Sequence, residues 1–165
     1  MLATINRLES EQVWSHLPGA SAAIETLGDI SAKSTLESNL IELTNLRCSQ
    51  LNGCAFCVDM HVKQAKIAGE RELRLYHVSI WRESNLFTPK ERAALEWTEA
   101  VTKLGDHGVS DAVFEAVRKE LSEKELTDLT FVLMVINGWN RASIAFQAVP
   151  GSQDEAYGLT AAGLS

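Results

Sequence analysis

The sequence predicts an all-α protein, and three observations support that fold class. Long segments carry apolar residues three and four positions apart, the spacing that gives an α-helix one apolar face. No segment shows the sustained alternation, rich in Val, Ile and Thr, that is typical of β-strands. Helix start and stop signals recur along the chain. We therefore expect a bundle of about seven helices, at residues 19–31, 35–51, 53–68, 71–82, 89–104, 111–119 and 123–147.

Capping residues set several of these boundaries. Three pairs have the spacing of a capping box, in which a Ser or Thr and a Glu three residues later each bind the other's backbone N–H: Ser34 with Glu37, Thr88 with Glu91, and Ser122 with Glu125. Pro89 suits the first turn of its helix, and Ser110 is placed to cap the helix at 111–119. Gly69 predicts the end of the helix at 53–68.

Length and composition favour one domain. The chain has 165 residues, 45% of them hydrophobic, which is enough to bury a single core. We expect one helical domain over residues 1–150 and a C-terminal tail over 151–165 that frays or reaches onto a neighbouring subunit. The net charge of −7 opposes binding to nucleic acid or to an anionic membrane surface.

Other features predict a cytoplasmic location and a homo-oligomer. No run approaches the roughly 20 consecutive apolar residues of a membrane helix, and charges in the first turns argue against a signal peptide. The helix at 123–147 is apolar on nearly every side from Leu126 to Ile136. We expect it to be buried all round, either at the centre of the fold or at a subunit interface.

The stretch SQLNGCAFCVDMHVKQ, residues 49–64, carries the chemistry. At about 100° per residue, Cys54, Cys57 and His61 share an arc of about 60° on one helix face. Asn52 and Gly53 predict a bend that places the two cysteines at the helix N-terminus, where free N–H groups and the helix dipole favour thiolate. His61, one turn beyond Cys57, is placed to accept a thiol proton.

Two other interpretations of these residues stay open. A cysteine on an apolar helix is commonly a small core residue, which is how we interpret Cys48. A structural zinc site is the second alternative, although tetrahedral zinc needs four ligands from more than one segment and no second Cys or His pair follows. A redox-active dithiol, with no cofactor or metal, is the interpretation we favour.

Residues 40–146 resemble the carboxymuconolactone decarboxylase superfamily, in particular its alkylhydroperoxidase D-like (AhpD-like) branch. The similarity includes the glutamate in IELTNLR, the CAFCVDMH motif and the late INGWNRASIAF segment, in that order. The resemblance implies an all-helical fold that assembles as an obligate homo-oligomer built from dimers, often a hexamer. It also implies a thiol-dependent peroxidase that needs no bound cofactor.

Carried over by residue, the resemblance makes Cys57 the peroxidatic cysteine, which becomes a sulfenic acid, and Cys54 the more exposed resolving cysteine. His61 and Glu42 would form the proton relay. The substrate would be a hydroperoxide, and a thioredoxin-like or lipoyl protein would reduce the disulfide. Phe56 departs from the family pattern, in which a second histidine precedes the peroxidatic cysteine, so we expect it to shape the pocket or to slow the peroxidase.

Two alternative functions stay open beside the peroxidase. The chain could be a non-enzymatic redox sensor or assembly module, or a decarboxylase-like family member without peroxidase turnover. Three histidines are expected to be surface or hydrogen-bonded residues without a catalytic role: His16, His77 and His107. Three tryptophans are expected in the core or at an interface: Trp81, Trp97 and Trp139. The late polar group, Asn137, Asn140 and Arg141, is expected to be structural, with pocket lining as the alternative.

Overall fold

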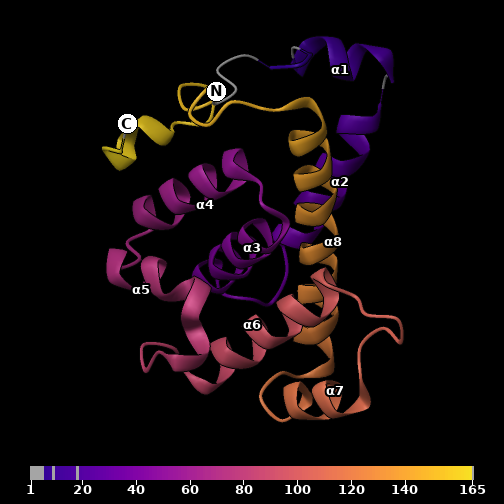
Figure 1. The fold of residues 1–165 in the computed structure, drawn as a ribbon, viewed down its shortest axis with the longest axis vertical. Coiled ribbons are helices and arrows are strands. Elements are labelled where there is room, and N and C mark those ends of the chain that lie inside the picture. Colours follow the sequence, from indigo (N-terminus) through magenta and orange to yellow (C-terminus); the bar gives the residue numbers. More distant parts are fainter. Residues whose placement is uncertain (1–5, 9, 18, 165) are drawn as a thin grey trace.

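A computed structural model describes residues 6–8, 10–17 and 19–164. Within these residues the chain is all-α, as predicted, with eight α-helices, two short 3-10 helices (η) and no β-strand (Figure 1). The elements are α1 Ser10–His16, α2 Ala20–Ala32, α3 Ser38–Asn52, α4 Ala55–Ile67, α5 Glu72–His77, η1 Val78–Glu83, α6 Pro89–Thr102, α7 Asp111–Arg118, α8 Glu123–Phe146 and η2 Leu159–Ala162.

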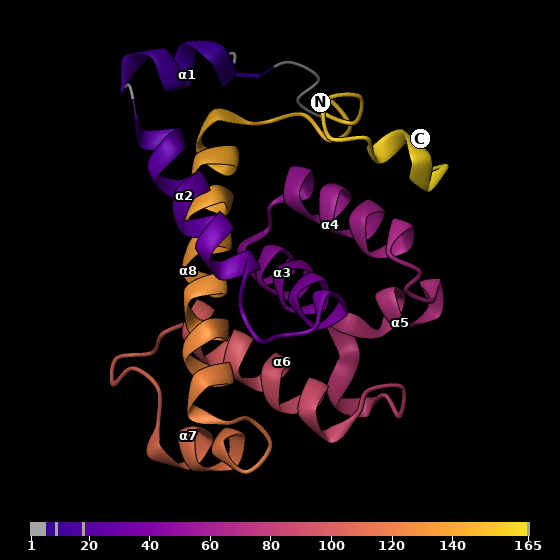
Figure 2. The same cartoon turned by 180° about the vertical axis from the view of Figure 1, so that it is seen from behind.

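Helix α3 forms the centre of the molecule. It packs against α4, α6 and α8, while α2 lies along α8 (Figures 1 and 2). Its Leu40, Leu43 and Leu46 recur every three residues and are fully or nearly fully buried. Two apolar clusters meet on this helix, one shared with α6, α7 and α8 and one with α4, α5, η1 and α6.

Helix α8 is only partly buried by its own chain. Leu129, Leu133 and Asn140 are completely buried, whereas Phe131 and Met134 are 44% and 52% exposed. The prediction that this helix is buried all round at the centre of the fold is therefore wrong for its outward face, which carries Phe131 and Met134. By length and composition alone α8 could also cross a membrane, a weak indication that core helices of soluble proteins share.

Two of the three predicted capping boxes are confirmed, those of α6 and α8, and Ser110 caps α7. The third is wrong, because α3 begins at Ser38 with Glu37 as its N-cap. The side chain of Asp128 on α8 accepts hydrogen bonds from the backbone N–H and the hydroxyl of Thr35, both at 3.0 Å. This tertiary contact replaces the first helical turn that Ser34 would have capped.

The C-terminal segment does not fray over its described residues. The buried Lys63 ammonium on α4 binds the carboxylates of Asp59 at 2.8 Å and Asp154 at 2.7 Å. Leu159 and Ala162 in η2 are also buried as η2 packs against α4. The segment therefore covers one side of α4 in its own chain and does not fray, while its contact with a neighbouring subunit stays a prediction.

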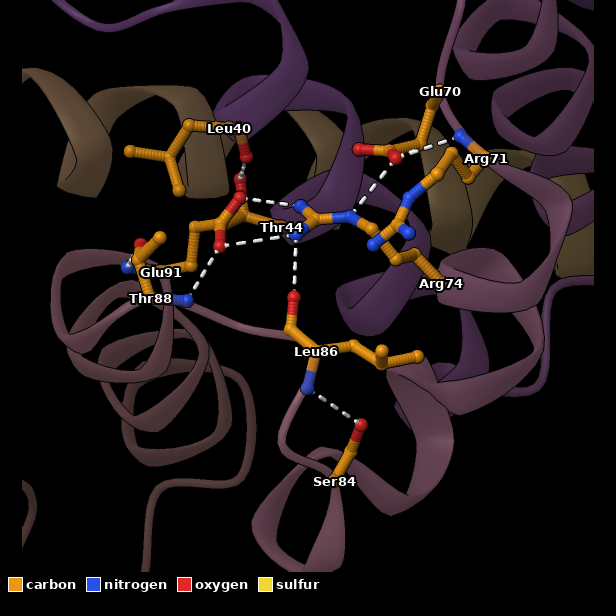
Figure 3. A network of polar contacts seen from close by, with 9 residues as sticks. All are labelled: Leu40, Thr44, Glu70, Arg71, Arg74, Ser84, Leu86, Thr88 and Glu91. Atoms are coloured by element: carbon orange, nitrogen blue, oxygen red, sulfur yellow. Dashed lines mark hydrogen bonds and ion pairs between the residues drawn. The ribbon is translucent and has the colours of Figure 1, made fainter.

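The helix expected at 71–82 divides into α5 and η1, with a break in helical geometry at Ile80. Arg74 of α5 holds this corner together (Figure 3). Its guanidinium donates to the Leu86 carbonyl at 2.6 Å and pairs with Glu70 at 2.9 Å and with Glu91. Burial raises the pKa of the Glu91 carboxyl, but hydrogen bonds from Arg74 and the Thr88 backbone N–H outweigh burial and hold that pKa below its usual value.

We expect Arg74→Met to lower the free energy of unfolding by about 2–4 kcal/mol, because two mostly buried carboxylates lose their cation. The Arg74 side chain is 12% exposed, whereas Arg82, which also pairs with two glutamates, is 48% exposed. Arg82→Met is the matched control and is expected to cost at most about 1 kcal/mol. Denaturant unfolding measures both, and equal losses would contradict the structural role given to Arg74.

Candidate active site

The turn between α3 and α4 places both cysteines of the motif. Gly53 ends α3 in the left-handed conformation, with φ 75°, which a residue with a side chain rarely adopts. Cys54 is then the N-cap of α4, and its Sγ accepts a hydrogen bond from the Cys57 backbone N–H at 3.3 Å. The predicted bend and the position of the dithiol at the helix N-terminus are confirmed, with the helix starting at Ala55 rather than at 53.

Once the dithiol has lost one proton, the two sulfurs share the other unequally. The pKa of the Cys54 thiol is lowered to about 7, mainly because the Cys57 thiol donates a hydrogen bond to it, with further help from the backbone N–H of Cys57 and the hydroxyl of Ser143. The same contact and burial raise the pKa of Cys57. In the reduced protein the negative charge therefore develops first on Cys54, stabilised by the S–H of Cys57.

Glu42 on α3 meets His61 on α4 beside this pair. The carboxylate Oε2 lies 2.9 Å from Nδ1 of the ring, and His61 is 7% exposed. A carboxylate at Nδ1 keeps the proton on that nitrogen in the neutral ring, so Nε2 is the free base. Among the described residues the ring makes no hydrogen bond to either sulfur, so a proton must pass between them through water or the substrate.

A cavity of about 660 Å³ opens beside these residues. It is bounded by the N-terminal segment, α2, α3, α4, α8 and the C-terminal segment. Cys57, His61 and Glu42 line it, as does the half-buried Phe56, whereas Cys54 does not. A molecule in the cavity thus meets Cys57 before Cys54.

The structure corrects one expectation about the dithiol. Cys54 is not the more exposed cysteine, since both residues are buried, Cys54 being 1% exposed and Cys57 3% exposed. The N-cap position turns the Cys54 side chain back over the first turn of α4, toward the Cys57 backbone N–H. Cys48 is completely buried, and burial raises the pKa of its thiol. Within the described ranges no three His, Cys, Asp or Glu side chains gather as a metal site.

The polar residues near the end of α8, Asn137, Asn140 and Arg141, lie next to the turn that carries the dithiol. Asn140 is completely buried and donates to Ser49 Oγ at 3.1 Å, while its oxygen accepts from Asn52 at 2.9 Å. Arg141 donates to the Asn137 side chain and carbonyl, both at 2.9 Å. The Asn140 contacts join α8 to the α3 end of the CAFC turn, whereas the Arg141 contacts lie within α8, in agreement with the structural role expected from the sequence.

Sequence reasoning missed Ser143. Its hydroxyl helps to lower the pKa of Cys54 and opposes the rise in the pKa of Cys57, and Ser143 also lines the cavity. The available signal was its position three residues after Asn140, which puts both side chains on the same face of α8. A serine in a helix of mixed polarity carries no other mark of a role.

We expect one thiol per chain of the reduced protein to ionise near pH 7, the value to which the Cys54 pKa is lowered. The rate of alkylation and the thiolate absorbance should both rise through that pH. Cys57→Ala removes the S–H donor and should move the midpoint upward, whereas Cys57→Ser keeps an O–H donor and should move it less. A midpoint in the usual thiol range for the unaltered protein would contradict this hydrogen-bond scheme.

Fold and site together define a helical protein with a dithiol at a helix N-terminus and a Glu–His pair beside it. The model of the carboxymuconolactone decarboxylase family matches residues 18–100. The uncharacterized protein YdfG of Bacillus subtilis is 41% identical over 113 residues, which cover 68% of this chain and 77% of YdfG. This chain belongs to the carboxymuconolactone decarboxylase family.

Solved structures show the same fold. ATU0492 from Agrobacterium tumefaciens, a protein of unknown function whose description links it to the antioxidant defence protein AhpD, is 38% identical with a TM-score of 0.82, covering 88% of this chain and 98% of that one. A peroxidase-related protein from Ralstonia eutropha, described as an alkylhydroperoxidase AhpD core, is 22% identical with a TM-score of 0.74, covering 86% of this chain and 75% of that one. The AhpD-like fold is therefore confirmed, and the second likeness concerns the fold alone.

Proposed function

We propose that this protein is a thiol-dependent peroxidase that reduces organic hydroperoxides with the Cys54–Cys57 dithiol. The observation that carries the proposal is the cavity in which Cys57 stands beside the Glu42–His61 pair, at the N-terminus of a helix. A peroxide needs a thiolate, a proton for its leaving oxygen and a second thiol, and these three groups lie together here.

The reaction begins with deprotonation of the dithiol. His61 takes one proton from the dithiol through water, and the remaining S–H proton moves from Cys57 to Cys54. The Cys57 thiolate attacks the terminal oxygen of the hydroperoxide, the O–O bond breaks, and His61 returns its proton to the leaving alkoxide. Cys57 is then a sulfenic acid and the product is an alcohol.

Resolution follows within the same turn of the helix. Cys54 attacks the sulfenic sulfur, its proton leaves with the hydroxyl as water, and a Cys54–Cys57 disulfide forms. An external dithiol, either a thioredoxin-like protein or a lipoyl domain, reduces this disulfide by exchange and is itself oxidised. One hydroperoxide and one external dithiol are consumed per cycle.

Steady-state turnover of cumene hydroperoxide with dihydrolipoamide tests the proposal. We expect continuous turnover and, without the reductant, the loss of two thiols per chain for one equivalent of peroxide. Cys48→Ala is the matched cysteine control and should leave turnover unchanged. A single stoichiometric oxidation with no turnover would exclude the peroxidase and support a redox sensor.

The cavity gives less support to decarboxylase chemistry. A decarboxylase binds a carboxylate substrate, and a buried carboxylate needs a cation or several donors around it. No Lys or Arg lines the cavity among the residues that the structure describes. Proton transfer by His61 alone would leave such a substrate poorly held.

We also propose that the chain forms a homo-oligomer through the outward face of α8. Phe131 and Met134 on that face are 44% and 52% exposed, which is costly for an isolated chain in water. Light scattering should give a mass above that of one chain, and Met134→Glu should lower it. The exposed Tyr76→Glu, away from this face, is the control for adding a charge.

A further inference from the structure

The cavity beside Cys57 holds acceptors and negative charge without a balancing cation. Three carboxylates line it, those of Glu25, Asp29 and Glu42, and no Lys or Arg does so within the described chain. Glu42 is bound to His61. Glu25 and Asp29 are exposed and, over the described residues, make no hydrogen bond or ion pair.

Glu25 and Asp29 lie four residues apart on α2, so they project from one face of that helix. Like charges at this spacing repel each other and weaken a helix. Both residues are exposed and line the cavity, so their negative charges act on a ligand as it enters. This arrangement repels anions and attracts cations.

We propose that this cavity selects uncharged or cationic organic molecules and that it rejects carboxylates. The apolar wall formed by Val132, Ile136 and Trp139 of α8 would hold the hydrocarbon part. The inference rests on the proposed function in taking the reacting ligand to be a hydroperoxide. It adds to that function the charge of the substrate.

Cumene hydroperoxides that differ only in the para substituent test the charge preference. We expect kcat/KM to be about fivefold to tenfold lower for the para-carboxylate than for the para-hydroxymethyl compound, and the para-aminomethyl compound to be at least as good as the latter. The double variant Glu25→Gln/Asp29→Asn should bring the carboxylate and hydroxymethyl values within about twofold. The control Glu115→Gln/Glu120→Gln removes the same charge from exposed sites at α7 and should leave the ratio unchanged.

The corresponding cumyl alcohols, which cannot oxidise a thiol, separate this inference from the peroxidase itself. Calorimetry should give the same order of affinities for the para-carboxylate, para-hydroxymethyl and para-aminomethyl alcohols. If these alcohols bind in the expected order but no hydroperoxide is turned over, the proposed function fails and the inference stands.

Equal or tighter binding of the carboxylate overturns the inference, even if turnover is fast. An unchanged carboxylate ratio in Glu25→Gln/Asp29→Asn would overturn it as well.

Discussion

Replacing Cys57 by Ser will lower kcat/KM for hydroperoxide by more than about a thousandfold, because the nucleophile itself is lost. Replacing Cys54 by Ser will stop multiple turnover but leave one reaction per chain, since Cys57 can still reach the peroxide. Mass spectrometry with dimedone, which traps sulfenic acid, should label Cys57 in Cys54→Ser. It should label nothing in Cys57→Ser.

The lower pKa of Cys54 by itself would predict the opposite roles. The larger thiolate fraction favours Cys54 as the nucleophile, whereas access favours Cys57, since of the two cysteines Cys57 alone lines the cavity. Access decides, because the proton between the two sulfurs can move within their hydrogen bond, whereas a peroxide in the cavity meets Cys57, which lines it, and not Cys54, which does not. A dimedone adduct on Cys54 in Cys57→Ser, with retained turnover, would reverse the assignment.

Cys48→Ala serves as the control for both variants. This cysteine is completely buried and accepts a hydrogen bond from Thr102 at 3.4 Å, away from the cavity wall. Its loss should change neither the labelling of Cys57 nor the rate. A loss of labelling in Cys48→Ala would mean that packing around α3, and not the dithiol chemistry, limits the reaction.

The features that the sequence predicted correctly depend on near neighbours in the chain. The capping boxes of α6 and α8 and the turn at Gly53 each join residues a few positions apart, so their spacing is visible without a structure. The Glu42–His61 contact joins residues 19 positions apart, and only the family resemblance suggested it. Spacing alone would have left Glu42 as a surface charge.

The features that were missed depend on tertiary contacts. Ser34 has the local pattern of a helix cap, but Asp128, about 90 residues later, binds Thr35 and keeps the segment out of the helix. The tail has the composition of a loose end, but Lys63 binds Asp154 and holds it against α4. Glu25 and Asp29 became candidates for substrate selection only when α2 was seen to border the cavity.

Glu42 and His61 are expected to act as one unit, which a double-mutant cycle can measure. His61→Asn removes the base and should lower kcat/KM by about a hundredfold to ten-thousandfold. Glu42→Gln keeps an acceptor for Nδ1–H but removes the charge that stabilises the protonated ring, and a loss of about tenfold to a hundredfold is expected. His77→Asn, at a histidine bound to Ser84 outside the cavity, should leave the rate unchanged.

The double variant Glu42→Gln/His61→Asn should be no slower than His61→Asn alone, because the carboxylate acts only through the ring that it holds at 2.9 Å. Circular dichroism and thermal unfolding on all four proteins check that the α3–α4 contact survives the substitutions. If the losses in kcat/KM multiply in the double variant, Glu42 contributes to the reaction independently of His61. Its position on the cavity wall would then point to direct contact with the substrate, since Glu42, like Cys57, borders the space where the peroxide binds.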